Sequence, residues 1–234
     1  METLLREEAN KFNIELTDQM VEQFMKYKTL LKEWNEKINL TAIIEDKEII
    51  IKHFIDSLTI AKYIPQNAYM IDVGTGAGFP GIPVKILRKD VKVVLLDSLN
   101  KRLNFLNEVI KELDLKDIET VHGRAEDAGN DLKYREKFDI ATARAVANIS
   151  TLSELCSPFV KVKGAFICMK ANASEEIANA QNALKILNLK EEEKEQFRID
   201  EIDSERTIIL YRKTDKTPKQ YPRKAGTPAS KPIK

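Results

Sequence analysis

The stretch that decides the fold runs Ile71-Asp72-Val73-Gly74-Thr75-Gly76-Ala77-Gly78-Phe79-Pro80-Gly81. A short apolar strand ends beside an acidic residue, three closely spaced glycines follow, and the chain then takes on helix-forming character. Glycine lets a loop adopt positive φ and lets a ligand approach bare backbone. A loop that leads into a helix also presents unpaired N–H groups at the positive end of the helix dipole. We therefore expect a polar or anionic group to lie at this loop.

The spacing of the glycines separates the cofactor classes. A dinucleotide fingerprint requires Gly-x-Gly-x-x-Gly, but here the glycines are Gly74, Gly76 and Gly78, and Phe79 stands at the sixth position. A nucleoside-triphosphate loop requires Lys-Ser or Lys-Thr after its last glycine, and neither pair is present. The Gly-x-Gly-x-Gly spacing is similar to that of S-adenosylmethionine-dependent methyltransferases, whose cofactor has a zwitterionic amino-acid end and no phosphate.

Short apolar runs alternate with amphipathic segments from residue 69 onward. Nearly all-apolar strands that alternate with helices indicate a parallel sheet covered on both faces, and right-handed crossovers make it doubly wound. The predicted strands are 69–73, 91–97, 117–122, 138–143 and 164–169, and the predicted helices are about 80–88, 99–113, 148–160 and 174–188.

The last two predicted strands, 196–203 and 206–212, are joined by Asp203-Ser204-Glu205 with no helix between them. A connection this short makes the pair antiparallel. The predicted fold class is therefore α/β: a doubly wound, mostly parallel seven-stranded sheet of the Rossmann-like methyltransferase type that ends in an antiparallel hairpin.

The first 65 residues are predicted to be helical and to lie outside the sheet. Apolar residues follow one helical face over 18–38, and Thr17 can cap that helix. Further helices are expected at about 4–12 and 46–63. The predicted domains are an N-terminal helical cap (1–65), a methyltransferase domain (66–213) and a basic, proline-containing C-terminal tail (214–234).

Composition indicates a globular protein of the cytoplasm. Apolar residues make up 43% of the chain and charged residues 32%, and no apolar run approaches the roughly 20 residues of a membrane span. Charge begins at Glu2, which argues against a signal peptide. The spacing of Cys156 and Cys168 fits neither a metal site nor a disulfide framework, so we expect two core thiols and no metal. We expect a monomer that does not bind membranes.

Positive charge is concentrated at the C-terminus. Residues 212–234 carry eight Lys or Arg and one acid, a net charge of +7, which leaves residues 1–211 at −6. The same segment holds four of the eight prolines. Such a segment is a tail or a clamp, and it can contact a polyanion or only improve solubility.

Ligands of doubly wound sheets bind at the carboxyl ends of the strands. Asp97 ends the second strand, 23 residues after Gly74, where its carboxylate can accept hydrogen bonds from ribose hydroxyls or can cap the next helix. A flat adenine can lie against the backbone at Ser98 and Leu99 after this strand, and at Ala125 and Glu126 after the third.

A cation follows each of the next two strands. Arg144 stands among small residues that let it reach across a pocket, and Lys170 can face the same cleft or be an ordinary solvated lysine. The Asn/Asp-Pro-Pro-aromatic motif of amine methylation is absent, and Cys156 and Cys168 are misplaced for covalent attack on a pyrimidine. The remaining candidate is an acceptor atom that needs neither a base nor a covalent nucleophile. Guanine N7 is such an atom, and Arg144 can hold the adjacent O6 or, equally, the cofactor carboxylate.

A set of motifs extends over nearly the whole chain: Trp34-Asn35, Ile38-Asn39-Leu40-Thr41-Ala42-Ile43, His53-Phe54-Ile55-Asp56-Ser57-Leu58, the glycine loop running into Phe79-Pro80-Gly81-Ile82-Pro83, Leu95-Leu96-Asp97-Ser98 with Lys101-Arg102, Gly123-Arg124-Ala125-Glu126, and Ala143-Arg144-Ala145-Val146. Together these motifs resemble the glucose-inhibited division protein B family of 16S ribosomal RNA guanine-N7 methyltransferases.

The resemblance implies S-adenosyl-L-methionine as donor and a guanine of 16S RNA, free or in the small subunit, as acceptor. Since the major groove of duplex RNA is too deep and narrow, the target base should be unpaired or extruded. Carried over by position, the cofactor site comprises Gly74, Phe79, Asp97, Ser98, Leu99, Ala125, Glu126 and Arg144. From their places after the fourth and fifth strands, Arg144 and Lys170 are the residues expected to position the reactants.

The His53–Asp56 pair and the function each allow more than one interpretation. His53 and Asp56 lie one turn apart on a predicted helix, and they can form a substrate-side pair or a structural hydrogen bond that fastens the helical cap. The function also has two alternatives: a methyltransferase of the same fold that acts on a protein or small molecule, and an RNA-binding relative without catalysis.

Overall fold

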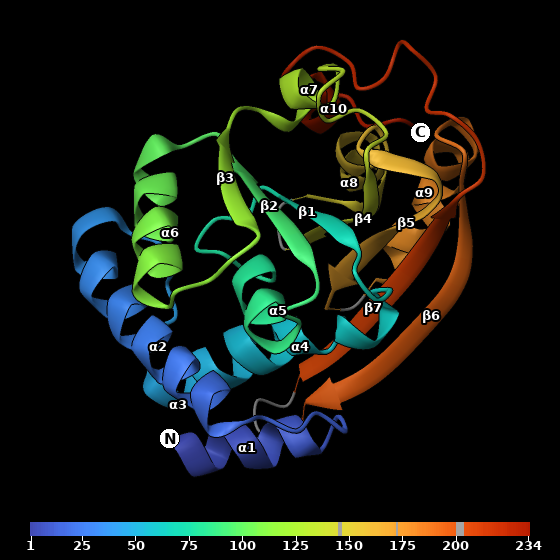
Figure 1. Ribbon diagram of the computed structural model, residues 1–234. Helices are drawn as coiled ribbons and strands as arrows, with labels where there is room; N and C mark the ends of the chain where they lie inside the picture. The colour runs from blue at the N-terminus through green and yellow to red at the C-terminus, as the bar shows by residue number, and fades with distance from the viewer. Residues whose placement is uncertain (145–146, 172, 200–203) are drawn as a thin grey trace.

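Seven strands form one sheet through the middle of the protein (Figure 1). The computed structural model describes residues 1–144, 147–171, 173–199 and 204–234. The order of strands across the sheet is β3-β2-β1-β4-β5-β7-β6. Their bounds are β1 (Tyr69–Val73), β2 (Lys92–Asp97), β3 (Ile118–His122), β4 (Phe138–Arg144), β5 (Val160–Lys170), β6 (Leu189–Ile199) and β7 (Ser204–Lys213).

The pairing of the strands confirms the predicted fold class. Strand β1 pairs in parallel with β2 and β4, and the parallel pairs β2 with β3 and β4 with β5 extend the sheet on both sides. Strand β7 is antiparallel to both of its neighbours, β5 and β6. The strand order reverses between β1 and β4, which is where ligands bind in sheets of this kind.

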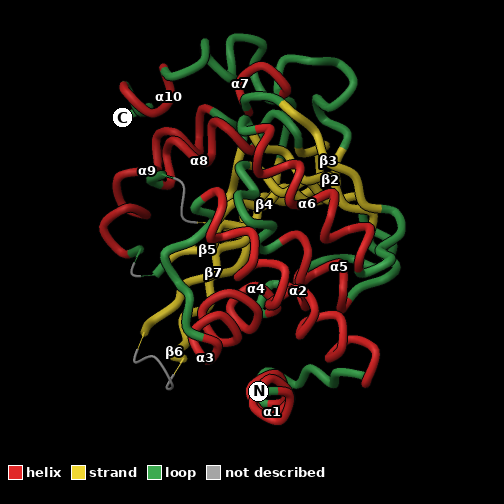
Figure 2. Tube along the Cα trace, turned by 90° about the vertical axis from the view of Figure 1, so that its left-hand side faces the viewer, coloured by secondary structure: helices red, strands yellow, loops and turns green. Residues whose placement is uncertain are grey.

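Helices cover both faces of the sheet, and side chains that alternate along each strand supply two separate cores. On β1, Met70 belongs to the core under α2, α5 and α6, whereas Ile71 and Val73 belong to the core under α8 and α9. Figures 1 and 2 show these two groups of helices on opposite sides of the sheet. The helices are α1 (Glu2–Asn10), α2 (Asp18–Ile38), α3 (Asp46–Glu48), α4 (Asp56–Leu58), α5 (Gly81–Leu87), α6 (Asn100–Glu112), α7 (Ala125–Ala128), α8 (Ile149–Cys156), α9 (Ser174–Ile186) and α10 (Thr227–Ser230).

The N-terminal helices pack directly on one face of the sheet. Helix α2 has the predicted bounds, and the Thr17 hydroxyl caps it by accepting from the Met20 N–H at 3.3 Å. The single helix predicted over 46–63 is wrong in detail, because the segment is α3, a π-helix η1 (Ile49–Ile55), α4 and a 3₁₀ turn η2 (Ala61–Tyr63). Six of the seven side chains of η1 are buried, so this segment is enclosed rather than amphipathic.

Three predicted boundaries are also corrected. Helix α8 ends at Cys156, and β5 begins at Val160, which pairs with Phe138 at the start of β4 before the register shifts at a bulge. Strand β6 begins at Leu189, seven residues earlier than predicted. Its first half is a run of exposed Lys and Glu with no apolar alternation, and such charges protect an edge strand from further pairing. The predicted turn Asp203-Ser204-Glu205 is corrected in part, because Ser204 and Glu205 already belong to β7, while residues 200–203 lie outside the described residues.

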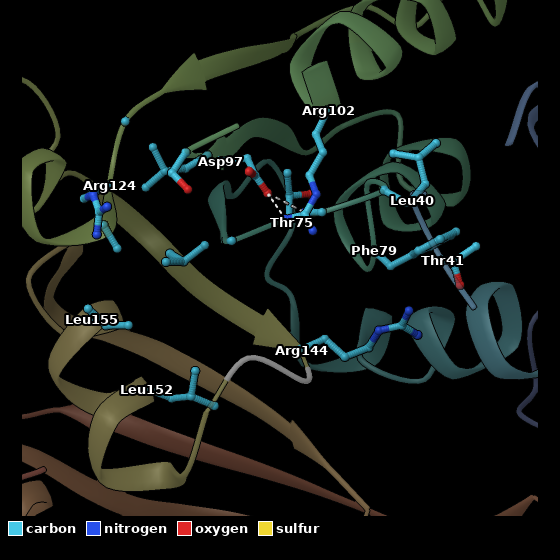
Figure 3. A pocket seen from close by; sticks show the side chains of 18 of the residues that line it. Leu40, Thr41, Thr75, Phe79, Asp97, Arg102, Arg124, Arg144, Leu152 and Leu155 are labelled. Atoms are coloured by element: carbon cyan, nitrogen blue, oxygen red, sulfur yellow. Dashed lines mark hydrogen bonds and ion pairs between the residues drawn. The ribbon is translucent and has the colours of Figure 1, made fainter. Parts of the chain in front are cut away.

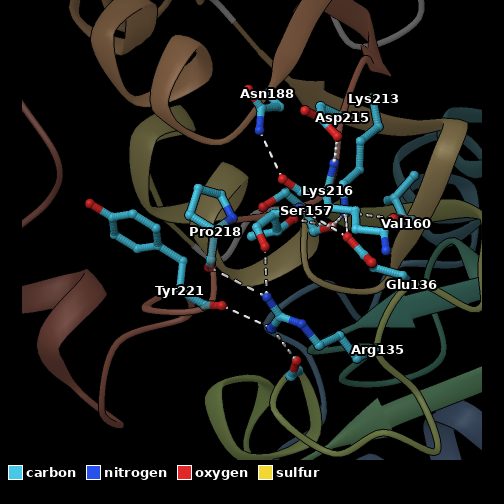
Figure 4. Close-up of polar contacts among 12 residues, drawn as sticks. Arg135, Glu136, Ser157, Val160, Asn188, Lys213, Asp215, Lys216, Pro218 and Tyr221 are labelled. Atoms are coloured by element: carbon cyan, nitrogen blue, oxygen red, sulfur yellow. Dashed lines mark hydrogen bonds and ion pairs between the residues drawn. The ribbon is translucent and has the colours of Figure 1, made fainter.

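The C-terminal segment, residues 214–234, packs back on the protein: α10 contacts α8, and residues 217–221 lie beside Arg135 (Figure 4). The Arg135 guanidinium donates to the carbonyl oxygens of Thr217 at 3.0 Å and Tyr221 at 2.9 Å. The carboxylate of Glu154 is fully buried and accepts two side-chain hydrogen bonds from Arg223. The segment is therefore a clamp whose contacts close the second core.

Candidate active site

A cavity of about 520 Å³ opens at the carboxyl ends of β1, β2 and β4 (Figure 3). The glycine loop forms one wall, and residues 96–98 and 123–126 form the next. Figure 3 shows Thr41, Phe79 and the Arg144 side chain gathered on one side, and Arg124, Leu152 and Leu155 on the other. Seven predicted site residues line this cavity: Gly74, Phe79, Asp97, Ser98, Ala125, Glu126 and Arg144.

The glycine loop is held in shape by Asp72 at the end of β1. Its Oδ2 accepts from the Thr75 hydroxyl at 2.7 Å and from the Gly81 N–H at 2.9 Å. Burial raises the pKa of the Asp72 carboxyl to about 6. The Asp72 carboxylate is thus the anionic group expected at the start of α5. The prediction that this helix end presents unpaired N–H groups to a ligand is wrong for Gly81 and Ile82. The N–H of Ile82 binds the Gly78 carbonyl.

Helix α2 fixes the loop from the other side. The Tyr27 hydroxyl donates to the Ala77 carbonyl, and both groups are buried. Gly78 has φ +96°, and a Cβ added there would lie 2.7 Å from Tyr27 Oη and 2.7 Å from Ile82 Cδ1. A side chain at this position would meet both a backbone and a packing penalty. The N-terminal helices therefore determine the shape of the loop.

Asp97 connects the loop to the end of β2. Its Oδ2 accepts from the Gly76 N–H at 2.9 Å and lies 3.3 Å from Arg102 Nη1, and its Oδ1 accepts from the Leu99 N–H at 2.9 Å. The side chain is 2% exposed and lines the cavity. Both proposed roles of Asp97 are thus compatible with the structure, since Oδ1 has a second lone pair for a ligand hydroxyl.

The predicted adenine-binding backbone divides into two groups. Ser98, Ala125 and Glu126 line the cavity, but Leu99 does not, and its N–H is already bound to Asp97. The Glu126 carboxylate accepts from the Gly226 N–H at 2.8 Å, so the cavity wall is joined to the C-terminal clamp. Sequence gave no sign of that contact, which spans 100 residues.

Arg144 at the end of β4 binds both members of the predicted pair on the N-terminal helices. Its Nη1 donates to Asp56 Oδ2 at 3.0 Å and to the Lys52 carbonyl at 2.9 Å, and its Nη2 donates to His53 Nδ1 at 2.8 Å. The guanidinium carbon lies 5.0 Å from the centre of the Phe79 ring, in cation–π range. His53 and Asp56 therefore fasten the helices to the sheet. The following Ala145-Val146 of the motif lies outside the described residues.

His53 extends this arrangement toward the cavity. Its ring stacks on Phe79 with centroids 4.3 Å apart, and its Nε2 lies 2.9 Å from Thr41 Oγ1. Burial, with the nearby Arg144 charge, lowers the pKa of His53 to about 3. The ring is neutral, and because Arg144 can only donate, the hydrogen is on Nε2 and points to Thr41.

Thr41 is a cavity residue that the sequence reasoning did not select. Its Oγ1 accepts from His53 and from the Ile43 N–H at 3.0 Å, so its own hydrogen can be donated to a ligand. The Asn35 side chain holds the turn by accepting from the N–H groups of Leu40 and Thr41. The Asn-Leu-Thr motif itself was the available signal.

Lys170 does not line this cavity. Its Nζ donates to the Ala147 carbonyl at 2.9 Å and lies 2.8 Å from Glu176 Oε2. It faces a second cavity of about 430 Å³, which shares His53 and Arg144 with the first. Its predicted role stays a prediction.

The described lining of the first cavity offers neither a thiol nor an evident free base. Cys156 and Cys168 are fully buried elsewhere, and burial raises the pKa of both thiols. The His53 ring is neutral and engaged at both nitrogens, and the carboxylates of Asp97 and Glu126 already accept hydrogen bonds. Among the described residues no cluster could hold a metal ion, and no helix could cross a membrane. The site is equipped to bind and orient its ligands.

Solved structures share the fold at low sequence identity. The crystal structure of M. jannaschii TYW2 in complex with AdoMet is 16% identical and has a TM-score of 0.56, with 73% of this chain and 77% of that chain covered. A SAM dependent methyltransferase from Aquifex aeolicus is 14% identical, with a TM-score of 0.51 and coverage of 71% and 93%.

Sequence relatives are much closer. Ribosomal RNA small subunit methyltransferase G of Acetivibrio thermocellus is 55% identical over 98% of this chain and 96% of its own length. The protein of the same name from Clostridium botulinum strain Loch Maree is 49% identical, with 99% and 98% covered. The family model described as rRNA small subunit methyltransferase G matches residues 20–207. The chain belongs to this family, GidB.

Proposed function

We propose that this protein transfers the methyl group of S-adenosyl-L-methionine to N7 of a guanine in 16S ribosomal RNA. The observation that carries the proposal is the first cavity, where the glycine loop and Asp97 meet Arg144 and where the described lining supplies no thiol and no unengaged base. Its relatives are named ribosomal RNA small subunit methyltransferase G, which supports ribosomal RNA of the small subunit as the acceptor.

The residues of the cavity suit this cofactor. Asp97 can accept from ribose hydroxyls, Ser98 and Ala125 line the cavity where their backbone can contact adenine, and Phe79 supplies an apolar wall. When bound, S-adenosylmethionine supplies a sulfonium methyl group. The remaining task of the protein is to hold the acceptor atom in line with that methyl group.

Guanine N7 matches a site without a base. It carries a lone pair and no proton, so one N–C bond forms as one S–C bond breaks and no proton has to leave. The guanidinium of Arg144 lies at the border of the cavity, where it can donate to O6 beside N7 or to the cofactor carboxylate. Positioning then accounts for most of the rate enhancement.

Methyl transfer to RNA tests the proposal. Purified protein and labelled S-adenosylmethionine are incubated with 16S RNA or small subunits from cells that lack the protein, and the product nucleosides are identified by mass spectrometry. We expect 7-methylguanosine at one position. A methyl group on an exocyclic amine or a pyrimidine carbon would contradict the N7 assignment, and transfer to a protein or small molecule instead of RNA would contradict the substrate class.

We further propose that the protein acts as a monomer in the cytoplasm, where its RNA substrate is made. Light scattering after size exclusion should give a mass close to 26.7 kDa. A stable dimer would contradict this part of the proposal.

A further inference from the structure

The second cavity adjoins the first across the side chains of Arg144 and His53, which line both. It has a volume of about 430 Å³ and lies among the ends of β4 and β5, the start of β7, the π-helix η1 and helix α9. Its lining contains no residue of the glycine loop. The geometry that suits the cofactor is therefore confined to the first cavity.

The partition between the cavities is a continuous series of polar contacts. Thr41 lies 2.9 Å from His53, His53 lies 2.8 Å from Arg144, Arg144 lies 3.0 Å from Asp56, and Asp56 lies 2.8 Å from Arg206. Because the Arg144 and Asp56 side chains are 14% and 8% exposed, solvent does little to loosen them. A group bound in one cavity thus has a fixed position relative to the other cavity.

The second cavity combines positive charge with an apolar surface. Its lining has four cationic side chains, Lys52, Arg144, Lys170 and Arg206, against the carboxylates of Asp56 and Glu176. Ile43, Met169 and Ala171 supply apolar contacts. Excess positive charge suits a phosphate, and a methionine thioether packs well against the edge of a flat ring.

We propose that this second cavity receives the extruded acceptor guanosine together with an adjoining phosphate. Arg144 in the partition can then donate to O6 of the base, which leaves the N7 lone pair free to face the methyl donor at the border between the two cavities. Lys170 contributes here rather than at the cofactor: its ammonium group has three donors, of which the described contacts use two. This inference rests on the proposed function, because it assigns the acceptor of the same reaction.

Filling the cavity tests the assignment. Ala171 lines the second cavity alone, and its backbone carbonyl accepts from the Thr207 hydroxyl in a way that substitution preserves. We expect the series Ala171→Val, Ala171→Leu and Ala171→Phe to lower kcat/KM for RNA progressively, reaching about 100-fold in the last variant, because the base loses its space. The Kd for S-adenosylmethionine, measured by calorimetry, should change by less than about threefold.

The matched control is Ala178→Phe, an equally large change at an exposed position of α9 outside both cavities. It should leave both quantities near the wild-type values. The graded series keeps the test informative if Ala171→Phe unfolds, which its thermal transition would reveal. Normal RNA turnover in Ala171→Leu, or weakened cofactor binding with unchanged RNA kinetics, would overturn the inference. Failure of the wild-type protein to methylate guanine N7 would instead overturn the proposed function.

Discussion

The two cavities that meet at Arg144 are built in different ways. The first contains the glycine loop, whose Gly76 N–H binds Asp97 and whose shape is held by Asp72 and Tyr27. The second contains no residue of that loop and is lined by residues of the N-terminal helices, the sheet and α9.

This difference matches two tasks: the binding of a cofactor that many enzymes share, and the recognition of one particular acceptor. A loop that holds a cofactor needs close approach and exact backbone geometry, which glycine spacing records in the sequence. Recognition of one acceptor needs charges and apolar groups at chosen points in space, and distant elements can supply them. Substitutions that disturb one cavity at a time test this difference, and the first concerns Arg144, which lines both cavities.

Replacing Arg144 should have the largest effect. Arg144→Ala removes the group common to both cavities, and we expect methyl transfer to RNA to fall by about 10³-fold. Asp56 keeps its contact with Arg206, so the thermal transition should persist. Arg144→Lys keeps the charge but loses the planar fork, and it should rescue little of the rate. Turnover near the wild-type value in Arg144→Ala would exclude this residue from the mechanism.

Gly78→Ala should damage the first cavity next most strongly. The added Cβ would lie 2.7 Å from Tyr27 Oη at a residue with φ +96°, so we expect the free energy of unfolding to fall by about 3 kcal/mol. S-adenosylmethionine binding should weaken as well. Gly226→Ala is the control, because Gly226 also has a positive φ, +84°, but nothing within 4 Å of the new atom. Equal losses in the two variants, measured by urea unfolding, would contradict the role of packing against Tyr27.

Asp97→Asn should affect the cofactor side alone. One oxygen becomes an NH₂ group that cannot accept from the N–H of Gly76 or Leu99, and we expect the Kd for S-adenosylmethionine to rise by about 10- to 100-fold. The KM for RNA should not change. Asp114→Asn, at an exposed side chain outside both cavities, is the control. A Kd like that of the wild type would remove Asp97 from the cofactor site.

The C-terminal clamp should bind RNA through its exposed lysines. Arg212, Lys213 and Arg223 are paired with Glu192, Glu136 and Glu154, so a deletion would confuse stability with binding. Replacing Lys219, Lys224 and Lys231 with Gln should weaken RNA binding and reduce the slope of log K against log salt by about 1 to 3.

The control for the clamp replaces three exposed lysines on α9 and β6, Lys185, Lys190 and Lys194, with Gln. Cofactor affinity should be unchanged in both triple variants. An unaltered salt dependence in the clamp variant would mean that the segment serves only to complete the fold.

Acid stability at the partition is expected to depend on His53. The folded protein holds His53 neutral with a pKa of about 3, whereas the unfolded chain takes up a proton below about 6.5. The stability contributed by neutral His53 is therefore lost as pH falls from about 6.5 toward 3, by at most about 1.4 kcal/mol per pH unit. His53→Gln should lose less stability than the wild type between pH 6.5 and 4 in urea unfolding. Parallel curves would contradict a neutral buried histidine.

Comparison with His53→Gln is needed because Asp72 acts in the opposite direction. Its pKa is raised to about 6, so its ionisation costs stability as pH rises through that value. The difference between the two proteins isolates His53, since Asp72 is common to both. The slope of the wild-type curve alone would combine the two groups.

The sheet was predictable because its strands carry near-continuous apolar runs and its helices carry one apolar face. Thr17 marked the start of α2 and the short connection after β6 marked the antiparallel pair. Strand β6 was misjudged because an edge strand that faces solvent needs no apolar alternation, and its charged first half is held by pairing with β7. The clamp was one of two interpretations of the C-terminal segment, but its anchors, Arg135 and Glu154, could not be predicted because they are ordinary charged residues in sequence.

The positions of Asp97 and Arg144 in the first cavity were predictable, because each residue stands at the carboxyl end of a strand. Leu99 follows the same rule but points its N–H at Asp97, since the turn after β2 needs that hydrogen bond. The second cavity could not be foreseen, and Thr41 was signalled only by its motif, because the position of both depends on how the N-terminal helices pack against the carboxyl edge of the sheet.

A crystal structure with S-adenosylhomocysteine bound tests the central claim most directly. We expect the adenosine to lie beside Asp97 and Ala125 and the homocysteine to extend along the glycine loop toward Phe79 and Arg144, with the second cavity free of the ligand. A ligand bound in the second cavity, or at a place away from the glycine loop, would contradict the account.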